Sequence, residues 1–535
     1  MKYPIGIQTF EKIISGGFVY VDKTDLIYSL ANGAQVYFLS RPRRFGKSLL
    51  LSTLKAYFEG RKELFAGLKI AELEQDWKRH VVFHIDFNGG NYALPGTLEA
   101  KIAGYLSDWE QEYGIVPGVD FNLGSRFYQI LKVACERSGR GAVVLIDEYD
   151  KPLLDVLEHD KELLSRNRET LKAFYSVFKQ ADEFLRFVFL TGVTKFSQVS
   201  VFSGFNQPLD ISMLSDYESL CGITEEELHR IFAEPIREMS IAQRCSEEEI
   251  RQQLKQRYDG YHFGESMVDI YNPFSVLNAF YARSIRDFWF ASGTPTYLIR
   301  LMNHYHEGID QLTGKYYSLD EFVNYKADTE YPLPMIYQSG YFTIKDYDRR
   351  RNRFLLDFPN NEVKSGLLTL IASNYLQLKE SVNNVAQDLT FALEDGELEQ
   401  FCALLTSFLA SIPYTMRRKE SEPERERYFQ YTFYLLLRLM SVYAVCLEME
   451  QSQGRVDCVV ETPKYVYIFE FKLDGLAEKA LLQIREKGYA RPFQNDERQV
   501  VLVGINFSSK TGTLDGWKYE FYHNTSVNFY RKIKS

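Results

Sequence analysis

The sequence is poor in the residues and patterns that mark several classes of protein. Its 535 residues include six cysteines and no Cys-x-x-Cys pair, which argues against a disulfide-stapled scaffold and against a zinc ribbon. The chain contains no internal repeat and no low-complexity segment. It has no run of 18 apolar residues, and the N-terminus lacks the apolar core of a secretory signal. We therefore expect a cytoplasmic protein that does not associate with membranes.

The overall composition is that of a globular protein. Hydrophobic residues make up 45% of the chain and charged residues 25%. At about 100–200 residues per domain, the length predicts two to four domains. There are 63 Lys and Arg residues and 72 Asp and Glu residues, for a net charge of −9. So acidic a chain is not a general nucleic-acid coat, although a local basic groove stays compatible with it.

The pattern of strand-like and helix-like stretches changes twice along the sequence. Up to about residue 235, strand-like stretches at residues 35–40, 81–87, 142–146 and 187–190 alternate with helix-like ones. This alternation predicts an α/β domain with a parallel sheet. Residues 236–410 are mostly helical in pattern. The charged stretch 417–427 then marks a boundary, after which strand-like residues 455–461, 465–472 and 499–505 surround a helix-like stretch, 476–487. We predict domains at 1–235, 236–410 and 411–535.

A candidate phosphate-binding loop lies near the N-terminus. Residues 40–48 read SRPRRFGKS, between a predicted strand and a predicted helix. A P-loop occupies such a place, because backbone N–H groups at the helix N-terminus bind phosphate. Lys47 would reach the β- and γ-phosphates, and the Ser48 hydroxyl would bind Mg²⁺. The predicted nucleotide-binding residues here are Arg41, Arg43, Arg44, Phe45, Gly46, Lys47 and Ser48.

This loop is degenerate, and two interpretations stay open. Arg41 stands where a P-loop has its first glycine. The three arginines either contact phosphate directly or pair with acids on a neighbouring element. The alternative for the whole segment is that Gly-Lys-Ser begins an ordinary helix.

A second motif strengthens the nucleotide interpretation. Residues 142–150 read AVVLIDEYD, a hydrophobic strand that ends in acids about 100 residues after the loop. Asp147 would hold Mg²⁺, and Glu148 would polarise the attacking water. Thr191 or Thr194, after the next strand, would sense the γ-phosphate from a strand between the other two. Taken alone, an Asp-Glu pair or a Thr-Gly turn after a strand is common in loops without such a function.

The C-terminal part carries a second carboxylate–lysine group. Asp457 begins one strand-like stretch, and Glu470 and Lys472 lie on one face near the end of the next because side chains alternate along a strand. Two carboxylates bind Mg²⁺ and position a water for phosphodiester cleavage, which Lys472 would orient. The predicted metal ligands of the chain are thus Ser48, Asp147, Asp457 and Glu470. Gln483 in the following helix would contact the metal site or the nucleic acid.

The alternative for this group is an exposed hairpin face with a Glu/Lys ladder. Phe469 and Phe471, on the opposite face, predict a half-buried strand instead. Tyr489 and Glu426 are further candidates near the site.

These motifs resemble a known combination of domains. Residues 19–24, 40–48, 144–152, 191–196 and 202–205 (VYVDKT, SRPRRFGKS, VLIDEYDKP, TGVTKF and FSGF) are similar to the AAA-ATPase-like domain of many anaerobic bacteria, in which the missing first P-loop glycine is the rule. Residues 420–520 resemble the PD-(D/E)xK nuclease-like domain that follows it, with Asp457, Glu470, Lys472 and Gln483 at the motif positions. Residues 271–276 (YNPFSV) resemble the same proteins.

The resemblance implies an ATP-binding, ATP-hydrolysing protein with a Mg²⁺-dependent nuclease module that acts on DNA and is gated by nucleotide state. The rival hypothesis is a nucleotide-dependent switch or scaffold whose C-terminal module binds nucleic acid or a partner without cleavage. A third has both sites non-catalytic. Whether the protein is a homo-oligomer, with an arginine from a neighbouring subunit completing the ATP site, is left open.

Overall fold

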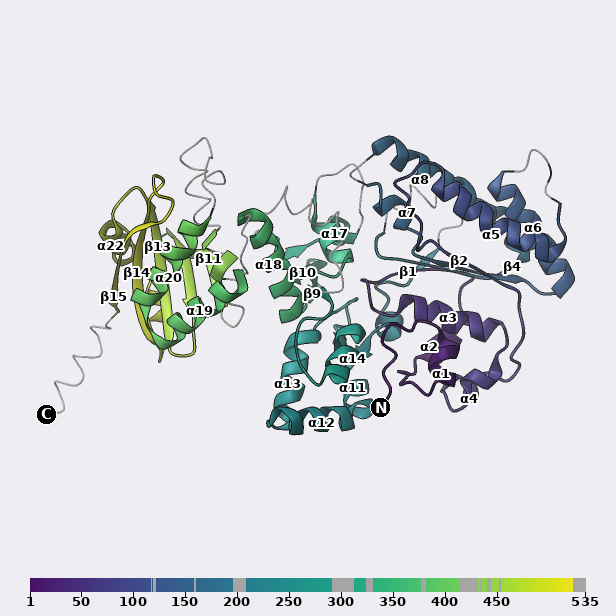
Figure 1. The fold of residues 1–535 in the computed structure, drawn as a ribbon, viewed down its shortest axis with the longest axis horizontal. Helices are drawn as coiled ribbons and strands as arrows, with labels where there is room; N and C mark the ends of the chain where they lie inside the picture. Colours follow the sequence, from purple (N-terminus) through teal and green to yellow (C-terminus); the bar gives the residue numbers. More distant parts are fainter. Residues whose placement is uncertain are drawn as a thin grey trace. The chain divides into compact units, whose positions relative to one another are not determined.

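We analysed a computed structural model of the chain. It describes residues 1–116, 118, 122–157, 160–195, 208–290, 312–323, 331–376, 382–412, 432–433, 435–437, 439, 444–451 and 454–522. The chain divides into two units, Met1–Val363 and Lys364–Ser535, and each is described here by itself (Figure 1). The predicted domain boundaries at residues 235 and 410 are not decided by this division and stay a prediction.

The first unit is built on a five-stranded sheet in the order β2-β3-β4-β1-β5. All of its strand pairs are parallel. The strands are β1 (Val36–Ser40), β2 (Val82–Asp86), β3 (Ala142–Asp147), β4 (Leu185–Gly192) and β5 (Leu209–Asp210). Every residue of β3 is buried, as expected for a central parallel strand covered on both faces. The predicted α/β fold class with a parallel sheet is confirmed.

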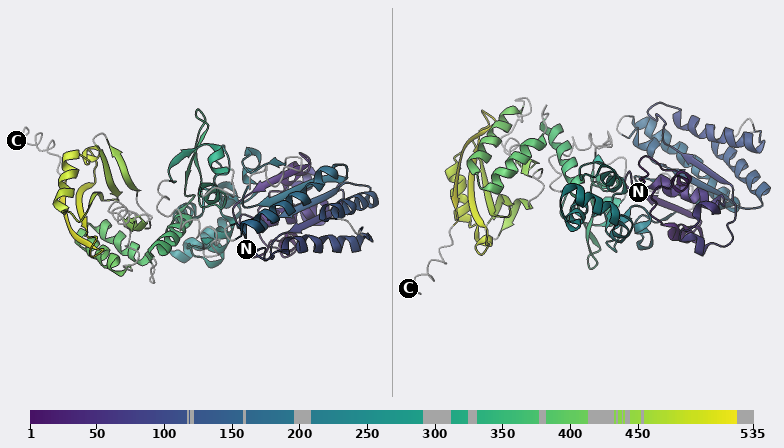
Figure 2. Two further views of the ribbon diagram at one scale, coloured as in Figure 1. Left: turned by 90° about the horizontal axis from the view of Figure 1, so that it is seen from above. Right: turned by 60° about the horizontal axis from the view of Figure 1, so that its bottom comes forward.

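Helices cover both faces of this sheet (Figure 1). One layer contains α5 (Thr97–Tyr113), α6 (Leu123–Ser138), α7 (Lys151–Leu154), α8 (Lys161–Tyr175) and α9 (Val177–Gln180). The opposite layer contains α1 (Phe10–Ser15), α2 (Thr24–Ala31), α3 (Lys47–Phe58) and α4 (Ile70–Leu73). In the right-hand view of Figure 2 the first helices (purple) and the later ones (blue) again lie on opposite sides of the sheet. Phe83, Phe127 and Phe174 form part of the core under the first layer.

The rest of the first unit is mainly helical, as predicted. Its helices are α11 (Glu225–Ile231), α12 (Ala233–Gln243), α13 (Glu247–Tyr258), α14 (Pro273–Ala282), α16 (Leu319–Val323) and α17 (Leu333–Gln338). Ser246 caps α13 through a capping box with Glu249, which explains why the predicted helix begins there. Pro235 lies in the first turn of α12, so the helical stretch breaks just before it, at Phe232.

Two small antiparallel sheets complete this unit. One pairs β6 (Ile223–Thr224) with β7 (Ile270–Tyr271), with Ile223 opposite Tyr271. The other has the order β8-β10-β9, from β8 (Lys315–Tyr317), β9 (Thr343–Asp348) and β10 (Arg353–Asp357). The helix α18 (Asn361–Leu376) begins at the end of the unit and continues past Val363.

The second unit contains a mixed five-stranded sheet in the order β11-β12-β13-β14-β15. Its strands are β11 (Ala444–Gln451), β12 (Gly454–Glu461), β13 (Tyr465–Leu473), β14 (Gln499–Phe507) and β15 (Leu514–Phe521), and its helices α19 (Val382–Asp395), α20 (Leu398–Ser411) and α22 (Ala477–Lys487). Only β13 and β14 are parallel, because α22 provides the crossover between them. None of the described helices combines the length and apolar character that a membrane span requires.

Candidate functional sites

The loop between β1 and α3 ends in a glycine that the backbone requires. Gly46 has φ +95°, in the left-handed region that residues with a Cβ rarely adopt. It is the N-cap of α3, and no described side chain caps this helix. The first N–H groups of α3 are therefore available to an anion, as in a phosphate-binding loop.

Lys47 is folded back onto this loop. Its Nζ donates to the carbonyl oxygens of Arg41 at 3.0 Å and Pro42 at 3.1 Å, and only 5% of the residue is exposed. Both partners are neutral carbonyl oxygens, so the ammonium group can exchange them for an incoming anion. Ser48 is partly exposed in the first turn of α3, next to Lys47.

Asp147 and Thr191 meet at the carboxyl edge of the sheet. Strand β4 lies between β1 and β3, which is the arrangement predicted for the threonine strand. Thr191 Oγ1 donates to Asp147 Oδ1 at 2.6 Å, and Leu39 is the partner of Thr191 in the register. Because parallel strands end at the same edge of a sheet, the loop after β1 and Asp147 at the end of β3 lie at the same edge.

Glu148 has an unusual backbone and a perturbed charge. Its φ is +48°, which is uncommon for a residue with a side chain. Burial raises the pKa of its carboxyl, and the positive charges of Lys47 and Arg43 oppose this rise. The carboxylate thus lies in the field of the loop's cations, where an acid that polarises water would have to be.

The other acid of this segment, Asp150, organises the end of β4. It accepts hydrogen bonds from the backbone N–H of Thr194 at 2.6 Å, from its hydroxyl at 2.7 Å, and from the Val193 N–H at 3.0 Å. Gly192 is needed between them, because a Cβ there would lie 2.6 Å from the Tyr149 ring. Of the two candidate threonines, Thr191 lies beside Asp147 and Thr194 is tied to Asp150. The Thr-Gly turn therefore has a packing reason that the sequence alone did not reveal.

The side chains of the loop have divided roles. The Arg41 guanidinium is buried, donates to the carbonyl oxygens of Ser40 and Ser212 at 3.0 and 2.7 Å, and lies over the Phe263 ring at 4.1 Å. Phe45 packs edge-on against Tyr261 at 4.8 Å. Both side chains thus contact the part of the unit that follows the sheet, and their predicted nucleotide contact stays a prediction.

The remaining two arginines are more accessible than Arg41. Arg44 is exposed, with its guanidinium 5.0 Å from the Phe274 ring, and Arg43 is partly exposed. Neither forms an ion pair with an acid among the described residues. The predicted alternative that they contact phosphate directly is compatible with these positions.

A cavity of about 110 Å³ lies beside Gly46. Its walls come from the N-terminal segment, from α3 and from the β6–α14 region, and include Tyr20, Leu49, Gly222, Pro273 and Leu277. A buried ion pair of 2.6 Å between Lys23 and Glu227 ties the N-terminal segment to α11. The cavity is apolar and opens next to the helix N-terminus that would bind phosphate. Sequence reasoning missed these residues, since they are far apart in the chain.

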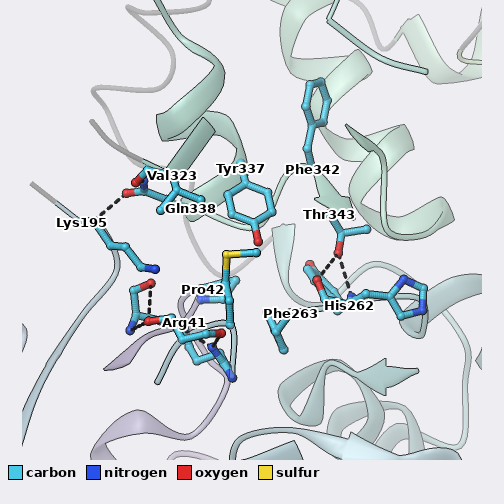
Figure 3. Close-up of a pocket in the computed structure, with 14 residues that line it drawn as sticks. Arg41, Pro42, Lys195, His262, Phe263, Val323, Tyr337, Gln338, Phe342 and Thr343 are labelled. Carbon is cyan, nitrogen blue, oxygen red and sulfur yellow. Dashed lines mark hydrogen bonds between the residues drawn. The ribbon is translucent and has the colours of Figure 1, made fainter. Parts of the chain in front are cut away.

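A smaller cavity lies on the other side of the loop (Figure 3). Its volume is about 30 Å³, enough for about two water molecules. Arg41 and Pro42 line it together with Tyr337 and His262, and Lys195 at its edge forms a 2.7 Å ion pair with Asp210. It is too small for a nucleotide, and its lining residues come from the sheet and from the part of the unit that follows it.

In the second unit the predicted carboxylate–lysine group is assembled. Asp457 on β12 accepts a hydrogen bond from the backbone N–H of Phe471 at 2.8 Å, so it lies beside Glu470. Gln483 on α22 donates from Nε2 to Glu470 Oε1 and accepts from Lys472 Nζ at 2.8 Å. Lys472 Nζ is 3.4 Å from Glu470 Oε1. All four predicted residues form one contact group.

Glu470 has an unsatisfied oxygen in this group. The residue is 2% exposed, and its Oε2 has no hydrogen-bond partner among the described residues. Burial and the neighbouring charge of Asp457 raise the pKa of its carboxyl to about 7. A buried carboxylate oxygen without a donor is costly, and a divalent cation between Glu470 and Asp457 would satisfy it. The residues present therefore fit the Mg²⁺ that was predicted here.

Strand β13 is more deeply buried than the sequence predicted. The prediction that β13 is half-buried is wrong: Phe401 of α20 packs on Phe469 at 6.0 Å, while α22 covers the other face, so the strand is buried on both sides. The exposed Glu/Lys ladder is excluded by the same burial. Tyr489 is 2% exposed and belongs to the core under α22. Glu426 lies outside the described residues.

Comparison with known proteins agrees with this architecture. A family model described as "Predicted AAA-ATPase" matches residues 4–202, and a model of the PD-(D/E)XK nuclease superfamily matches residues 424–517. The two define the class: an AAA-ATPase-like domain joined to a nuclease-superfamily domain, as the sequence motifs predicted. A protein of Azotobacter chroococcum mcd 1, described as "Uncharacterized protein in vnfD 5'region", is 37% identical over 529 residues, which cover 97% of this chain and 99% of the relative. The chain belongs to this family of two-domain proteins.

A solved structure, Cdc6p from Pyrobaculum aerophilum, matches with 12% identity over 68% of this chain and 92% of that chain. Its TM-score is 0.24, which is too low to indicate a shared fold.

Proposed function

We propose that the protein binds and hydrolyses ATP and that its C-terminal module is a Mg²⁺-dependent nuclease acting on DNA, with nucleotide state gating the nuclease. The observation that carries the proposal is the same in both units: a lysine close to two carboxylates that a five-stranded sheet positions. In the first unit these are Lys47, Asp147 and Glu148. In the second they are Lys472, Asp457 and Glu470.

In the first unit, the triphosphate would lie on the N-terminus of α3. Lys47 would exchange its two carbonyl partners for phosphate oxygens, which are stronger acceptors. Ser48 and Asp147 would hold Mg²⁺, which supplies charge neutralisation when bound, and Thr191 would keep the Asp147 carboxylate in place. Glu148 would orient the water. The base would occupy the apolar cavity beside Gly46, between Tyr20 and Leu277.

In the second unit, Asp457 and Glu470 would hold Mg²⁺ next to a DNA phosphate. Lys472 is fixed by Gln483 at 2.8 Å, so its ammonium group is aimed at the site. It would favour the deprotonated form of the attacking water by stabilising negative charge. Gln483 would also position the Glu470 carboxylate through Oε1 and leave Oε2 for the metal.

A chain of contacts supports the gating part of the proposal. Trp289 Nε1 donates to the Arg43 carbonyl oxygen in the nucleotide loop at 3.1 Å. The backbone N–H of Trp289 donates at 2.7 Å to Glu362, which is one residue before the first unit ends. Phosphate binding would shift the carbonyl groups of the loop, and Trp289 would transmit that shift to the start of α18. The Trp289→Phe variant is expected to bind ATP within about threefold of wild type and to lose the ATP dependence of DNA cleavage.

The proposal is tested with the purified full chain, plasmid DNA, Mg²⁺ and ATP. We expect ATP turnover that DNA stimulates and that Glu148→Gln abolishes, and nicking that Lys472→Ala abolishes. Lys464→Ala, at an exposed lysine in the turn of the same hairpin, is the matched control and should cut normally. ATP turnover without cleavage under any nucleotide condition would favour the rival switch; cleavage that survives Lys472→Ala would remove the nuclease assignment.

A further inference from the structure

Three carboxylates that take no part in either site gather behind the cavity beside Gly46. Glu225 is the first residue of α11, Asp259 follows α13, and Asp269 precedes β7. One oxygen of each lies within 4.8 Å of the others. The three acids thus come from separate segments of the chain, and their carboxylates lie close together.

Asp259 is the reason to look for a ligand here. It is 1% exposed, and neither of its carboxylate oxygens has a hydrogen-bond partner within the described part of the chain. The nearest cation is Lys255, whose Nζ is 3.7 Å from Oδ2, beyond hydrogen-bonding distance. Burial and the neighbouring charge of Asp269 raise the pKa of the Asp259 carboxyl to about 7. A buried carboxylate without a hydrogen-bond donor lowers the stability of the fold unless a cation binds to it.

One side chain, Lys255, lies within ion-pair distance of all three acids. Lys255 pairs closely with Glu225 and lies 3.3 Å from Asp269, but 46% of its side chain is exposed. Lys345 uses its ammonium group on the carbonyl oxygens of Gly260 at 3.0 Å and Pro359 at 2.7 Å instead.

His262 holds one of the three acids in place. Its Nε2 lies 2.7 Å from Asp269 Oδ1, and its Nδ1 lies 2.7 Å from the carbonyl oxygen of Ile344. Metal-bound carboxylates are commonly fixed in this way by a second residue that does not itself bind the metal. The cluster therefore has oxygen ligands from three elements and a support behind one of them.

We propose that Glu225, Asp259 and Asp269 bind a hard divalent cation of the Ca²⁺, Mg²⁺ and Mn²⁺ class. The donors are all carboxylate oxygens, which these ions prefer. Lys255 would swing into solvent when the ion binds, which its exposure permits. The assignment does not depend on whether either of the other two sites binds its ligand.

The position of the cluster indicates what the ion would do. Glu225 follows β6 directly and Asp269 precedes β7 directly, and these two-residue strands pair only through Ile223 with Tyr271 and Thr224 with Ile270. Gly222, Ile223 and Pro273 line the cavity beside Gly46 and lie together at one end of this ribbon, and Glu225 and Asp269 lie together at its other end. An ion that joins the two flanking acids would fix this wall of the cavity.

The test is Mn²⁺ binding by the nucleotide-free full chain, followed by electron paramagnetic resonance of free Mn²⁺. The background carries Asp147→Asn and Asp457→Asn, so that the other two metal sites do not contribute. We expect one bound Mn²⁺ per chain and a loss of affinity of about tenfold or more in Asp259→Asn. Glu226→Gln, at the exposed neighbour of Glu225, should leave binding unchanged.

Two further results decide the matter. Lys255→Met should bind Mn²⁺ more tightly, because the competing ammonium group is gone, and Mn²⁺ should raise the thermal midpoint of the background protein but not that of Asp259→Asn. The proposal is overturned if the background binds no Mn²⁺, if Asp259→Asn binds it equally well, or if Lys255→Met neither binds Mn²⁺ nor is stabilised by it. Absence of Mn²⁺ binding in the background protein would leave Lys255 as the cation of this cluster.

Discussion

Replacing Glu470 with glutamine should stabilise the metal-free nuclease domain at alkaline pH. The raised pKa means that the folded protein holds a proton on Glu470 between about pH 4.5 and 7, where the unfolded chain has released it. Stability contributed by this group is therefore greatest at low pH and falls as the pH rises to 7. Above pH 7 the folded protein is therefore less stable, by about 3 kcal/mol, than it would be if the Glu470 carboxyl kept a pKa of 4.5.

The Glu470→Gln substitution removes the negative charge, but it leaves a polar side chain buried at this position. Its amide can keep the hydrogen bond with Gln483, while the buried N–H₂ takes the place of Oε2 without an acceptor, at a cost of about 1 kcal/mol. The net gain of Glu470→Gln in chelator at pH 8 is then about 2 kcal/mol. This corresponds to about 30-fold slower hydrogen exchange of the backbone amides of β13.

Hydrogen–deuterium exchange of the β13 peptide, read by mass spectrometry at matched pH, measures this local opening without interference from the first unit. The difference should vanish or reverse at pH 5, and Mg²⁺ at pH 8 should protect the wild type but not the variant. Glu486→Gln, at an exposed position of α22, is the matched control. Equal protection of variant and wild type at pH 8, or a difference that persists at pH 5, would refute the reasoning.

Three other substitutions test the first unit. Lys47→Met should raise the Kd for ATP about 100-fold in calorimetry, because charged hydrogen bonds are worth about 1.5–3 kcal/mol each; unchanged affinity would contradict the phosphate role. Leu277→Trp should fill the cavity beside Gly46 and weaken ATP binding about tenfold while leaving tripolyphosphate binding alone, and an equal effect on both ligands would argue against the base assignment. Gly192→Ala places a methyl group 2.6–2.7 Å from Tyr149 and Asp150 and should lower the unfolding free energy by about 2 kcal/mol, seen as a reduced Tm; an unchanged Tm would show that these side chains move aside.

The parts of the fold that the sequence predicted are those with a local signal. Strands expected at residues 35–40 and 142–146 are found at Val36–Ser40 and Ala142–Asp147, since each is a continuous apolar run. The helix after Ser246 begins where its capping box requires. The acids of both groups could be located from the sequence for the same reason: each lies on or directly after a predicted strand, and the sheets bring these strands together.

What could not be predicted depends on contacts between distant segments. The two-residue strands β6 and β7 pair across 45 intervening residues and have too few positions to show a period. The cavity beside Gly46 takes its walls from residues as far apart as Tyr20 and Leu277. The hydrogen bond from the Arg41 guanidinium to the Ser212 carbonyl oxygen joins residues 171 positions apart in the chain, and no local pattern indicates it.

The arrangement of the first unit gives a physical reason for the degenerate loop. A glycine at position 41 would leave the carbonyl of Ser212 without the guanidinium that joins it to the end of β1, and the Phe263 ring without its cation. Arg41 therefore fastens the nucleotide loop to the segment that follows the sheet, as Trp289 does at the Arg43 carbonyl. A flexible loop can bind phosphate by itself, whereas a loop held at two points must move its attachments when phosphate binds.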